Sequence, residues 1–413
     1  MAQAPKFQED LIDMTESLWK LRDTNYDHTL NLIIRLISDN EISVFNIIDA
    51  IDLASIWNCK SIKLYVDLCI SICNRKPLIG KKYFNNKMLQ ALLVKKGIIG
   101  LEIPLNFVNY SENQIYTYNF KNKIMQSIIF DDINSLHVLT ATSAFDYNQT
   151  INYANLLDIS ATFGAVNCFK YIYLNHAKIT ITTLENAFLG NNFEIVRICI
   201  QNINNISPRC IENAIKAHNF DLVEYLYVNF NMPIPLSFAL NNYNFRVFFE
   251  YFTTEQINES LLISSVSHSL YPITRYLLEN KANPNVIDSF QQTSLHICCE
   301  RNDYNTAKLL IQHHIDVNCL NSKGQSSLMI AVQNNHDRLA RLLLNNGAKT
   351  EIIDKYDKTA RMYAKENNNL KIVFMIDRYS RIEKKVNSEH SITLDMIPSS
   401  TFSDLHKIVL LNC

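Results

Sequence analysis

Residues 293–325 read TSLHICCERNDYNTAKLLIQHHIDVNCLNSKGQ, and residues 326–357 read SSLMIAVQNNHDRLARLLLNNGAKTEIIDKYD. The motif that opens at Thr293 recurs at Ser326, 33 residues later, and Thr359 follows after another 33. A fixed period that opens each time on a good N-cap residue predicts pairs of short helices joined by turns. One such pair carries two apolar stripes and cannot bury both alone, so the copies are expected to stack.

A small residue follows each opening motif, at Cys298, Ala331 and Ala364, where it allows close approach of the neighbouring helix. Upstream, the same position recurs in shorter steps of 25 to 27 residues from Ser160 onward. The upstream members are Ser127, Ser160, Ala187, Ala214, Ala239 and Ser265. These steps hold two helices and a tight loop but no hairpin. We therefore expect hairpin tips only in the last three or four units.

The long copies resemble the ankyrin repeat family. Thr293 to His296 stand where the family has Thr-Pro-Leu-His, Asn302 and Asn335 begin its Gly-His dipeptide, and Gly347 lies in the turn after the second helix. The short upstream copies, preceded by a helical region, resemble protist ankyrin proteins with short degenerate repeats and an N-terminal domain of unknown function. The resemblance implies an all-α fold: an ankyrin-type helical-hairpin solenoid of eight or nine units after a helical N-terminal domain.

We expect four parts. Residues 1–118 form a helical N-terminal domain, 119–255 short degenerate repeats, 256–380 repeats with the 33-residue period, and 381–413 a tail whose residues 402–411 could form a capping helix. Apolar periodicity predicts five helices in the first part, near Phe7–Leu21, His28–Ile37, Val44–Trp57, Ser61–Cys73 and Lys82–Lys95.

Composition excludes several classes of function. With 39 basic and 40 acidic residues there is no basic excess for neutralising phosphates, so no nucleic-acid partner is expected. The seven glycines cannot build either common nucleotide-binding loop, and no small-molecule cofactor is implied. No apolar run is long enough for a membrane span. The ten cysteines and the absence of a signal-peptide pattern indicate a reducing compartment, cytoplasmic or nuclear.

Candidate chemistry is sparse. His296, Cys298 and Cys299 suggest metal ligands, as do His313-His314 and His336, but no paired C-x₂-C motif accompanies them. The family resemblance makes His296 a structural residue of the turn and Cys298 a core residue. No cysteine is placed beside a fixed base at a helix start, so no catalytic residue is predicted. The aromatic series Phe193, Phe220, Phe245 and Tyr271 is expected to be core.

In families that this chain resembles, partners contact the hairpin tips and polar residues of the first helix. By register, the tip positions are Ser289, Phe290, Gln292, Ser322, Lys323, Gln325, Lys355, Tyr356 and Lys358. The first-helix positions are Glu300, Arg301, Gln333, Asn334, Glu366 and Asn367. Two interpretations of Phe290 and Tyr356 stay open: exposed anchors for a partner, or packing against the neighbouring hairpin. Gln291 and Asp357 replace the glycine found at Gly324, which suggests that those two tips differ in shape.

The sequence thus favours a non-catalytic scaffold that binds another protein, of unknown identity. One alternative is an adaptor that brings a substrate protein to an enzyme complex such as a ubiquitin ligase or kinase. A second alternative is an enzyme whose site lies in residues 1–118, although no motif for one is visible there. A scaffold predicts no pocket lined by convergent titratable groups, whereas an adaptor predicts two separable binding surfaces.

Overall fold

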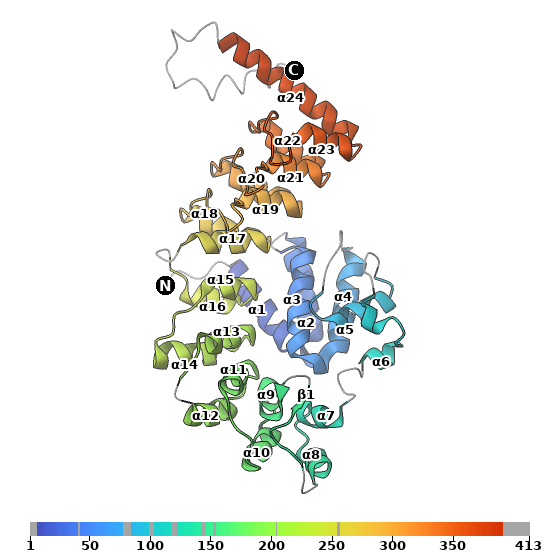
Figure 1. Cartoon of the computed structure of the whole chain (residues 1–413), viewed down its shortest axis with the longest axis vertical. Coiled ribbons are helices and arrows are strands. Elements are labelled where there is room, and N and C mark those ends of the chain that lie inside the picture. Colours follow the sequence, from blue (N-terminus) through green and yellow to red (C-terminus); the bar gives the residue numbers. More distant parts are fainter. Residues whose placement is uncertain are drawn as a thin grey trace. The chain divides into compact units, whose positions relative to one another are not determined.

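The computed structural model describes residues 6–39, 42–76, 84–98, 103–116, 122–141, 145–151, 154–203, 205–253 and 257–390. These residues are mostly helical (Figure 1). One small antiparallel sheet joins β1 (Thr150–Ile151) to β2 (Ala154–Asn155), with Thr150 opposite Asn155. The chain divides into two compact units, residues 1–276 and 277–413. The predicted capping helix at 402–411 lies outside the described residues.

The N-terminal helices follow the predicted pattern. They are α1 (Lys6–Trp19), η1 (Asp23–Asn25), α2 (Tyr26–Ser38), α3 (Val44–Trp57), η2 (Cys59–Ser61), α4 (Ile62–Arg75), α5 (Lys87–Lys95), η3 (Leu105–Phe107) and α6 (Glu112–Tyr116). Helix α3 has its predicted bounds, whereas α5 begins at Lys87 because the Asn86 side chain caps it, accepting from the backbone N–H groups of Met88 and Leu89. Buried Tyr65 ties α4 to α1 by donating to the carbonyl of Leu18 at 2.7 Å.

Nine successive helix pairs follow in the described chain. The first six are α7 (Lys123–Ile129) with α8 (Ile133–Thr140), α9 (Leu156–Thr162) with α10 (Val166–Leu174), α11 (Ile181–Leu189) with α12 (Phe193–Asn202), α13 (Pro208–Lys216) with α14 (Phe220–Phe230), α15 (Leu236–Asn241) with α16 (Phe245–Tyr251), and α17 (Glu259–Ser267) with α18 (Tyr271–Glu279). The last three are α19 (Ser294–Arg301) with α20 (Tyr304–Gln312), α21 (Ser327–Gln333) with α22 (Asp337–Asn345), and α23 (Ala360–Glu366) with α24 (Leu370–His390).

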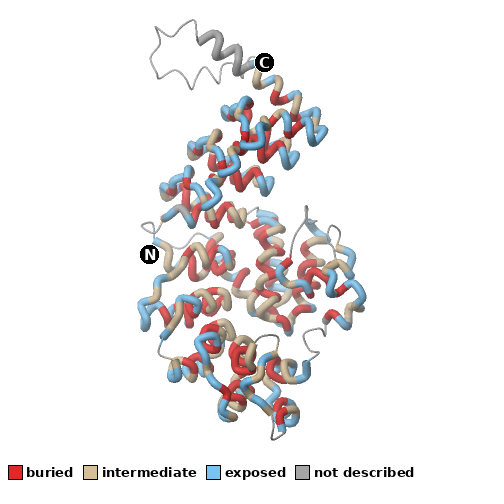
Figure 2. The backbone as a smooth tube through the Cα atoms, in the orientation of Figure 1, coloured by how far each residue is buried: buried red, intermediate tan, exposed pale blue. Residues whose placement is uncertain are grey.

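The turn inside each pair confirms the register. One residue there adopts the left-handed backbone conformation in every pair: Asp131, Gly164, Asn191, His218, Tyr243, Ser269, Asn302, Asn335 and Asn368. The small residue of each first helix is also buried in all nine pairs, from Ser127 to Ala364. Figure 2 shows the consequence, with buried residues on the sides of the helices that face their neighbours. Small side chains therefore let successive first helices pack closely, as the repeat pattern predicts.

The aromatic series differs from the expectation at one position. Phe245 is fully buried, Phe220 and Tyr271 are half-buried, and Phe193 is 48% exposed. Phe193 is the first residue of its helix, where the side chain reaches sideways to the next pair and not inward. Its ring lies edge-on against Tyr225 at 6.5 Å between centroids. The expectation that the whole series is core is wrong for Phe193.

Connection length separates two kinds of pair. From α9 to α17, the links between pairs run over residues 175–180, 203–207, 231–235 and 252–258, which is five to seven residues each. From α18 to α23 they run over 280–293, 313–326 and 346–359, which is 14 each. We call α9–α16 the short pairs and α19–α24 the long pairs. As expected, only the long links form hairpin tips, closed in the first two by the bridges Ile287–Thr293 and Leu320–Ser326.

The N-terminal helices pack against the short pairs within the first unit (Figure 1). The Trp19 indole N–H donates to the carbonyl of Lys216 at 2.8 Å, and its ring stacks on His218 with 3.6 Å between centroids. Arg246 of α16 forms a 2.9 Å ion pair with Glu16 of α1. These contacts involve the turns inside the pairs and the start of the second helices. This edge of the short pairs is therefore covered by the chain itself.

Candidate protein-binding surface

Each of the three hairpin tips in the long pairs is held by one side chain. The Asp288 carboxylate accepts from the backbone N–H groups of Phe290 and Gln292, both at 2.8 Å. Asn321 does the same in the second tip, accepting from Lys323 and Gln325. In the third tip Asp354 accepts from Tyr356 at 2.9 Å and Lys358 at 3.0 Å. The three residues are spaced by 33. Sequence reasoning overlooked them, although Asp or Asn at this spacing ahead of a turn is a readable signal.

The three tips share one shape, so the predicted difference at Gln291 and Asp357 is wrong. Gln291 has a φ of 58° and Asp357 a φ of 57°, close to the 73° of Gly324. The side-chain acceptor at Asp288 and at Asp354 stabilises the turn and offsets the cost of a left-handed residue that is not glycine.

Neighbouring tips are also joined to each other. The backbone N–H of Ser322 donates to the carbonyl of Phe290, and that of Lys355 donates to the carbonyl of Lys323, both at 3.0 Å. The tips therefore form a continuous row with a fixed backbone. A rigid backbone lowers the entropy that a partner must remove on binding.

Large side chains project from this row. Phe290 is 66% exposed and Tyr356 61% exposed, which decides between the two interpretations in favour of exposure. One aliphatic residue per tip is exposed as well, at Ile287, Leu320 and Ile353. These three are 33 residues apart, and the period itself could have identified them. We call Ile287, Phe290, Leu320, Lys323, Ile353 and Tyr356 the tip row.

The predicted tip and first-helix residues meet in register. Gln292 donates to Glu300 at 2.6 Å, and Lys358 pairs with Glu366 at 2.7 Å. The middle unit repeats the contact with a looser 3.4 Å hydrogen bond from Gln325 to Gln333. Polar residues of each tip and each first helix thus belong to one surface, continuous with the tip row.

Fourteen of the fifteen predicted partner-binding residues reach the surface. Gln292 and Lys358 are half-buried, and twelve are exposed: Ser289, Phe290, Glu300, Arg301, Ser322, Lys323, Gln333, Asn334, Lys355, Tyr356, Glu366 and Asn367. Gln325 is buried, because its amide lies under the third tip against the Tyr363 hydroxyl at 3.4 Å. Its side chain is thus not accessible to a partner.

His296 is a structural residue. Its Nδ1 accepts from the backbone N–H of Thr293 at 3.0 Å, and its Nε2 lies 3.1 Å from the carbonyl of Gln325, which can only accept. Both ring nitrogens are therefore engaged in joining one pair to the next tip. Burial lowers the pKa of His296, so the ring is neutral at physiological pH.

The buried cysteines have the chemistry of core residues. Burial raises the pKa of Cys298 well above its ordinary value and that of Cys210 to about 11. A neutral thiol is a poor nucleophile and a poor metal ligand. Within the described residues, no group of three or more His, Cys, Asp or Glu side chains lies close enough to hold a metal ion.

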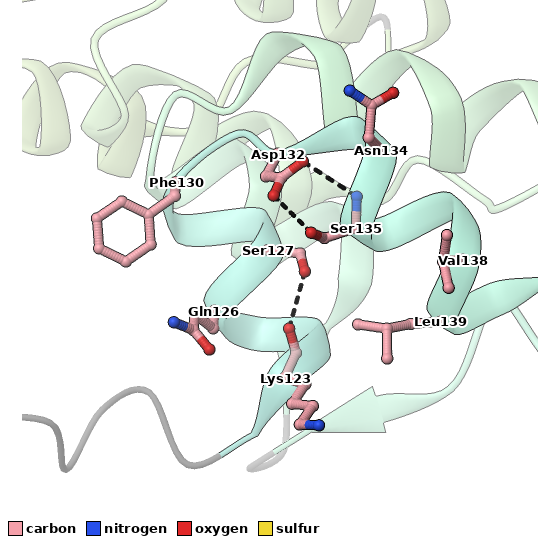
Figure 3. A pocket seen from close by; sticks show the side chains of 9 residues that line it. All are labelled: Lys123, Gln126, Ser127, Phe130, Asp132, Asn134, Ser135, Val138 and Leu139. Carbon is pink, nitrogen blue, oxygen red and sulfur yellow. Dashed lines mark hydrogen bonds between the residues drawn. The ribbon is translucent and has the colours of Figure 1, made fainter.

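A hollow of about 620 Å³ lies on the outer side of α7 and α8 (Figure 3). Its main polar groups already serve the helices. Asp132 accepts from the backbone N–H of Ser135 at 3.0 Å and from its hydroxyl at 2.5 Å, and these bonds lower its pKa. The Ser127 hydroxyl donates to the carbonyl of Lys123 at 2.9 Å. The hollow brings together no nucleophile and base.

Comparison with known families agrees with the repeat pattern. Residues 214–321 and 295–387 match the family described as ankyrin repeats in three copies. Residues 174–251 match a domain of unknown function (DUF3447), a match that falls on the short pairs. No curated protein matches the chain. In the described part of the chain, no helix is both long and apolar enough to cross a membrane.

Proposed function

Because this chain is an ankyrin repeat protein, and such repeats generally mediate protein–protein interactions, we propose that it is a non-catalytic scaffold that binds one protein partner through the tip row and the adjoining polar residues of the long pairs. The observation that carries the proposal is the set of exposed apolar side chains on a fixed backbone. Aromatic residues held this way are typical anchors of interfaces.

Three further features support the proposal. The tips alternate apolar residues with the cations Lys323 and Lys355, a mixture that favours a partner segment with apolar and acidic residues. The paired residues Gln292–Glu300 and Lys358–Glu366 form a polar margin beside the row. The neutral buried thiols fit the reducing interior of a cell, and we propose a cytoplasmic or nuclear location.

The proposal is tested by affinity capture with three full-length baits. The first is the unchanged chain, the second carries Phe290→Ala and Tyr356→Ala, and the third carries Leu174→Ala and Val228→Ala. Leu174 is 75% exposed and Val228 68% exposed, both on short pairs, so the third bait removes comparable apolar surface elsewhere. We expect a specific protein to be lost, by tenfold or more, from the second bait only.

Equal recovery of every captured protein by the first two baits, with folding intact by circular dichroism, would contradict the proposal. The full chain is required because the N-terminal helices pack on the short pairs, through Trp19 and Glu16, and their removal would expose a surface that is covered in the native protein.

A further inference from the structure

The second helices of the long pairs form a surface that differs from the tip row in place and in chemistry. A hollow of about 350 Å³ lies along α20, α22 and α24, lined by Tyr304, Asp337, Arg338, Arg341 and Lys371. We call it the basic groove. Three of its five residues are cations and one is an anion. Helix α20 contains no Asp or Glu, and α22 contains only Asp337.

The single anion is already neutralised from within. Asp337 pairs with Lys371 at 2.7 Å and accepts from the amide of Asn369 at 3.0 Å, and the hydrogen bond from Lys371 lowers its pKa. It therefore stays ionised and holds Lys371 in place. The charge left over is that of the two arginines.

Both arginines are exposed, and neither forms an ion pair within the described residues. The Arg338 guanidinium lies over the ring of Tyr304, 4.8 Å from its centroid, which restrains the side chain. Arg341 lies one helical turn further along the same face. Lys308 of α20, exposed and one turn after Tyr304, adds a further positive charge.

The register comparison shows that this charge is particular to the long pairs. The second residue of the second helix is Arg338 in α22 and Lys371 in α24, but Glu194 in α12 and Asp221 in α14. Exposed Phe374, 72% accessible, lies one turn after Lys371. The groove thus offers forked cations beside an apolar side chain.

We propose that the basic groove is a second binding surface, independent of the tip row, that takes an acidic segment of a partner protein. Guanidinium groups match carboxylates in a two-pronged geometry, and Arg338 is oriented in advance by Tyr304. Glutamate or aspartate side chains of the segment contact Arg338 and Arg341, and a neighbouring apolar residue contacts Phe374.

The test uses the full chain and a fluorescein-labelled peptide of four Glu-Glu-Leu repeats, with a control peptide in which Gln replaces every Glu. Fluorescence anisotropy is measured at 50 and 300 mM salt. One variant carries Arg338→Gln and Arg341→Gln. A matched variant, Lys323→Gln with Lys355→Gln, removes the same charge from the tips. A labelled single-stranded thymidine 15-mer serves as the nucleic-acid probe.

We expect the Glu-Leu peptide to bind the unchanged chain, to bind about tenfold more weakly to the arginine variant, and to be unaffected by the lysine variant. Binding should weaken at the higher salt concentration because the contacts are exposed. Equal affinity for the Gln peptide, equal weakening by both variants, or tighter binding of the 15-mer than of the peptide would each overturn the proposal. None of these outcomes bears on the capture test of the tip row.

Discussion

The short and long pairs are built on one plan and use their extra residues differently. Both place a small buried residue in the first helix and a left-handed residue in the turn inside the pair. The long pairs add seven to nine residues to each connection, and these residues build the tips and not the core. The short pairs lack tips, and their turn edge is covered by the N-terminal helices. The repeat length therefore separates surface that is used within the chain from surface left for partners.

The residue in the left-handed turn reflects this difference. In the long pairs it is exposed Asn302, Asn335 and Asn368, a residue that tolerates this conformation well. In the short pairs it becomes His218 and Tyr243, both buried. Larger side chains at positive φ cost stability, and here packing against α1 or neighbouring pairs offsets that cost.

The largest expected effect tests the tighter packing of the short pairs. A Cβ at Gly190 would lie 1.7 Å from the carbonyl oxygen of Ala161 in the preceding pair. Gly190→Ala should therefore destabilise the first unit by about 3 kcal/mol through overpacking. At the same register the long pairs carry exposed Arg301, so Arg301→Ala should cost less than about 0.5 kcal/mol. Urea unfolding of both variants measures the difference, and equal costs would remove this distinction between the pairs.

The next effect concerns the tips. Asp354 accepts from the backbone of Tyr356 and Lys358 and from the Tyr363 hydroxyl at 2.5 Å. Asp354→Ala should cost about 2 kcal/mol, because three donors lose their acceptor. Asp354→Asn is the matched control, since Asn321 holds the middle tip. Amide exchange over residues 346–359 reports the change. Unaltered protection in the alanine variant would contradict the role of this side chain.

A pH effect of similar size belongs to the covered edge of the short pairs. Burial between Trp19 and the turn lowers the pKa of His218 to about 3, whereas the unfolded chain has a pKa near 6.5. The unfolded state therefore binds the proton more readily, and stability is lost as pH falls below about 6.5. Between pH 7 and pH 5 the loss should be about 2 kcal/mol.

This loss can be followed by Trp19 fluorescence in a Trp57→Phe background during urea unfolding. His218→Asn places the residue of the long pairs at this position and should remove that share of the pH dependence. If the variant kept the full slope between pH 7 and pH 5, the titration would belong to other groups and not to the docked edge.

The smallest effect tests how the tips tolerate a left-handed residue. Asp357→Gly should stabilise the second unit by about 0.5 to 1 kcal/mol, because glycine adopts a φ of 57° without strain. Gly324→Ala should destabilise it by a similar amount. Thermal unfolding of the pair of variants gives both signs. A destabilised Asp357→Gly variant would mean that the Asp357 side chain makes a contribution of its own to the tip.

The repeat pattern predicted much of this architecture and part of the surface. The small residues and the Asn of each turn gave the register, because they recur at fixed spacing. The tip acceptors Asp288 and Asp354 were missed, since their effect is a hydrogen bond to backbone two and four residues later. The contact of Trp19 with His218 joins segments 199 residues apart and has no periodic signal. Gln325 was misplaced because burial under the next tip depends on Tyr363.

The central claim is that partners bind the tips of the long pairs and not the short pairs. Photo-crosslinking in cells tests it directly, with a benzophenone amino acid replacing Phe290 in one full-length chain and Val228 in another. The two positions are 66% and 68% exposed, so they sample solvent equally. The account predicts a discrete protein adduct from position 290 and none from position 228. An adduct from position 228 with none from position 290 would contradict it.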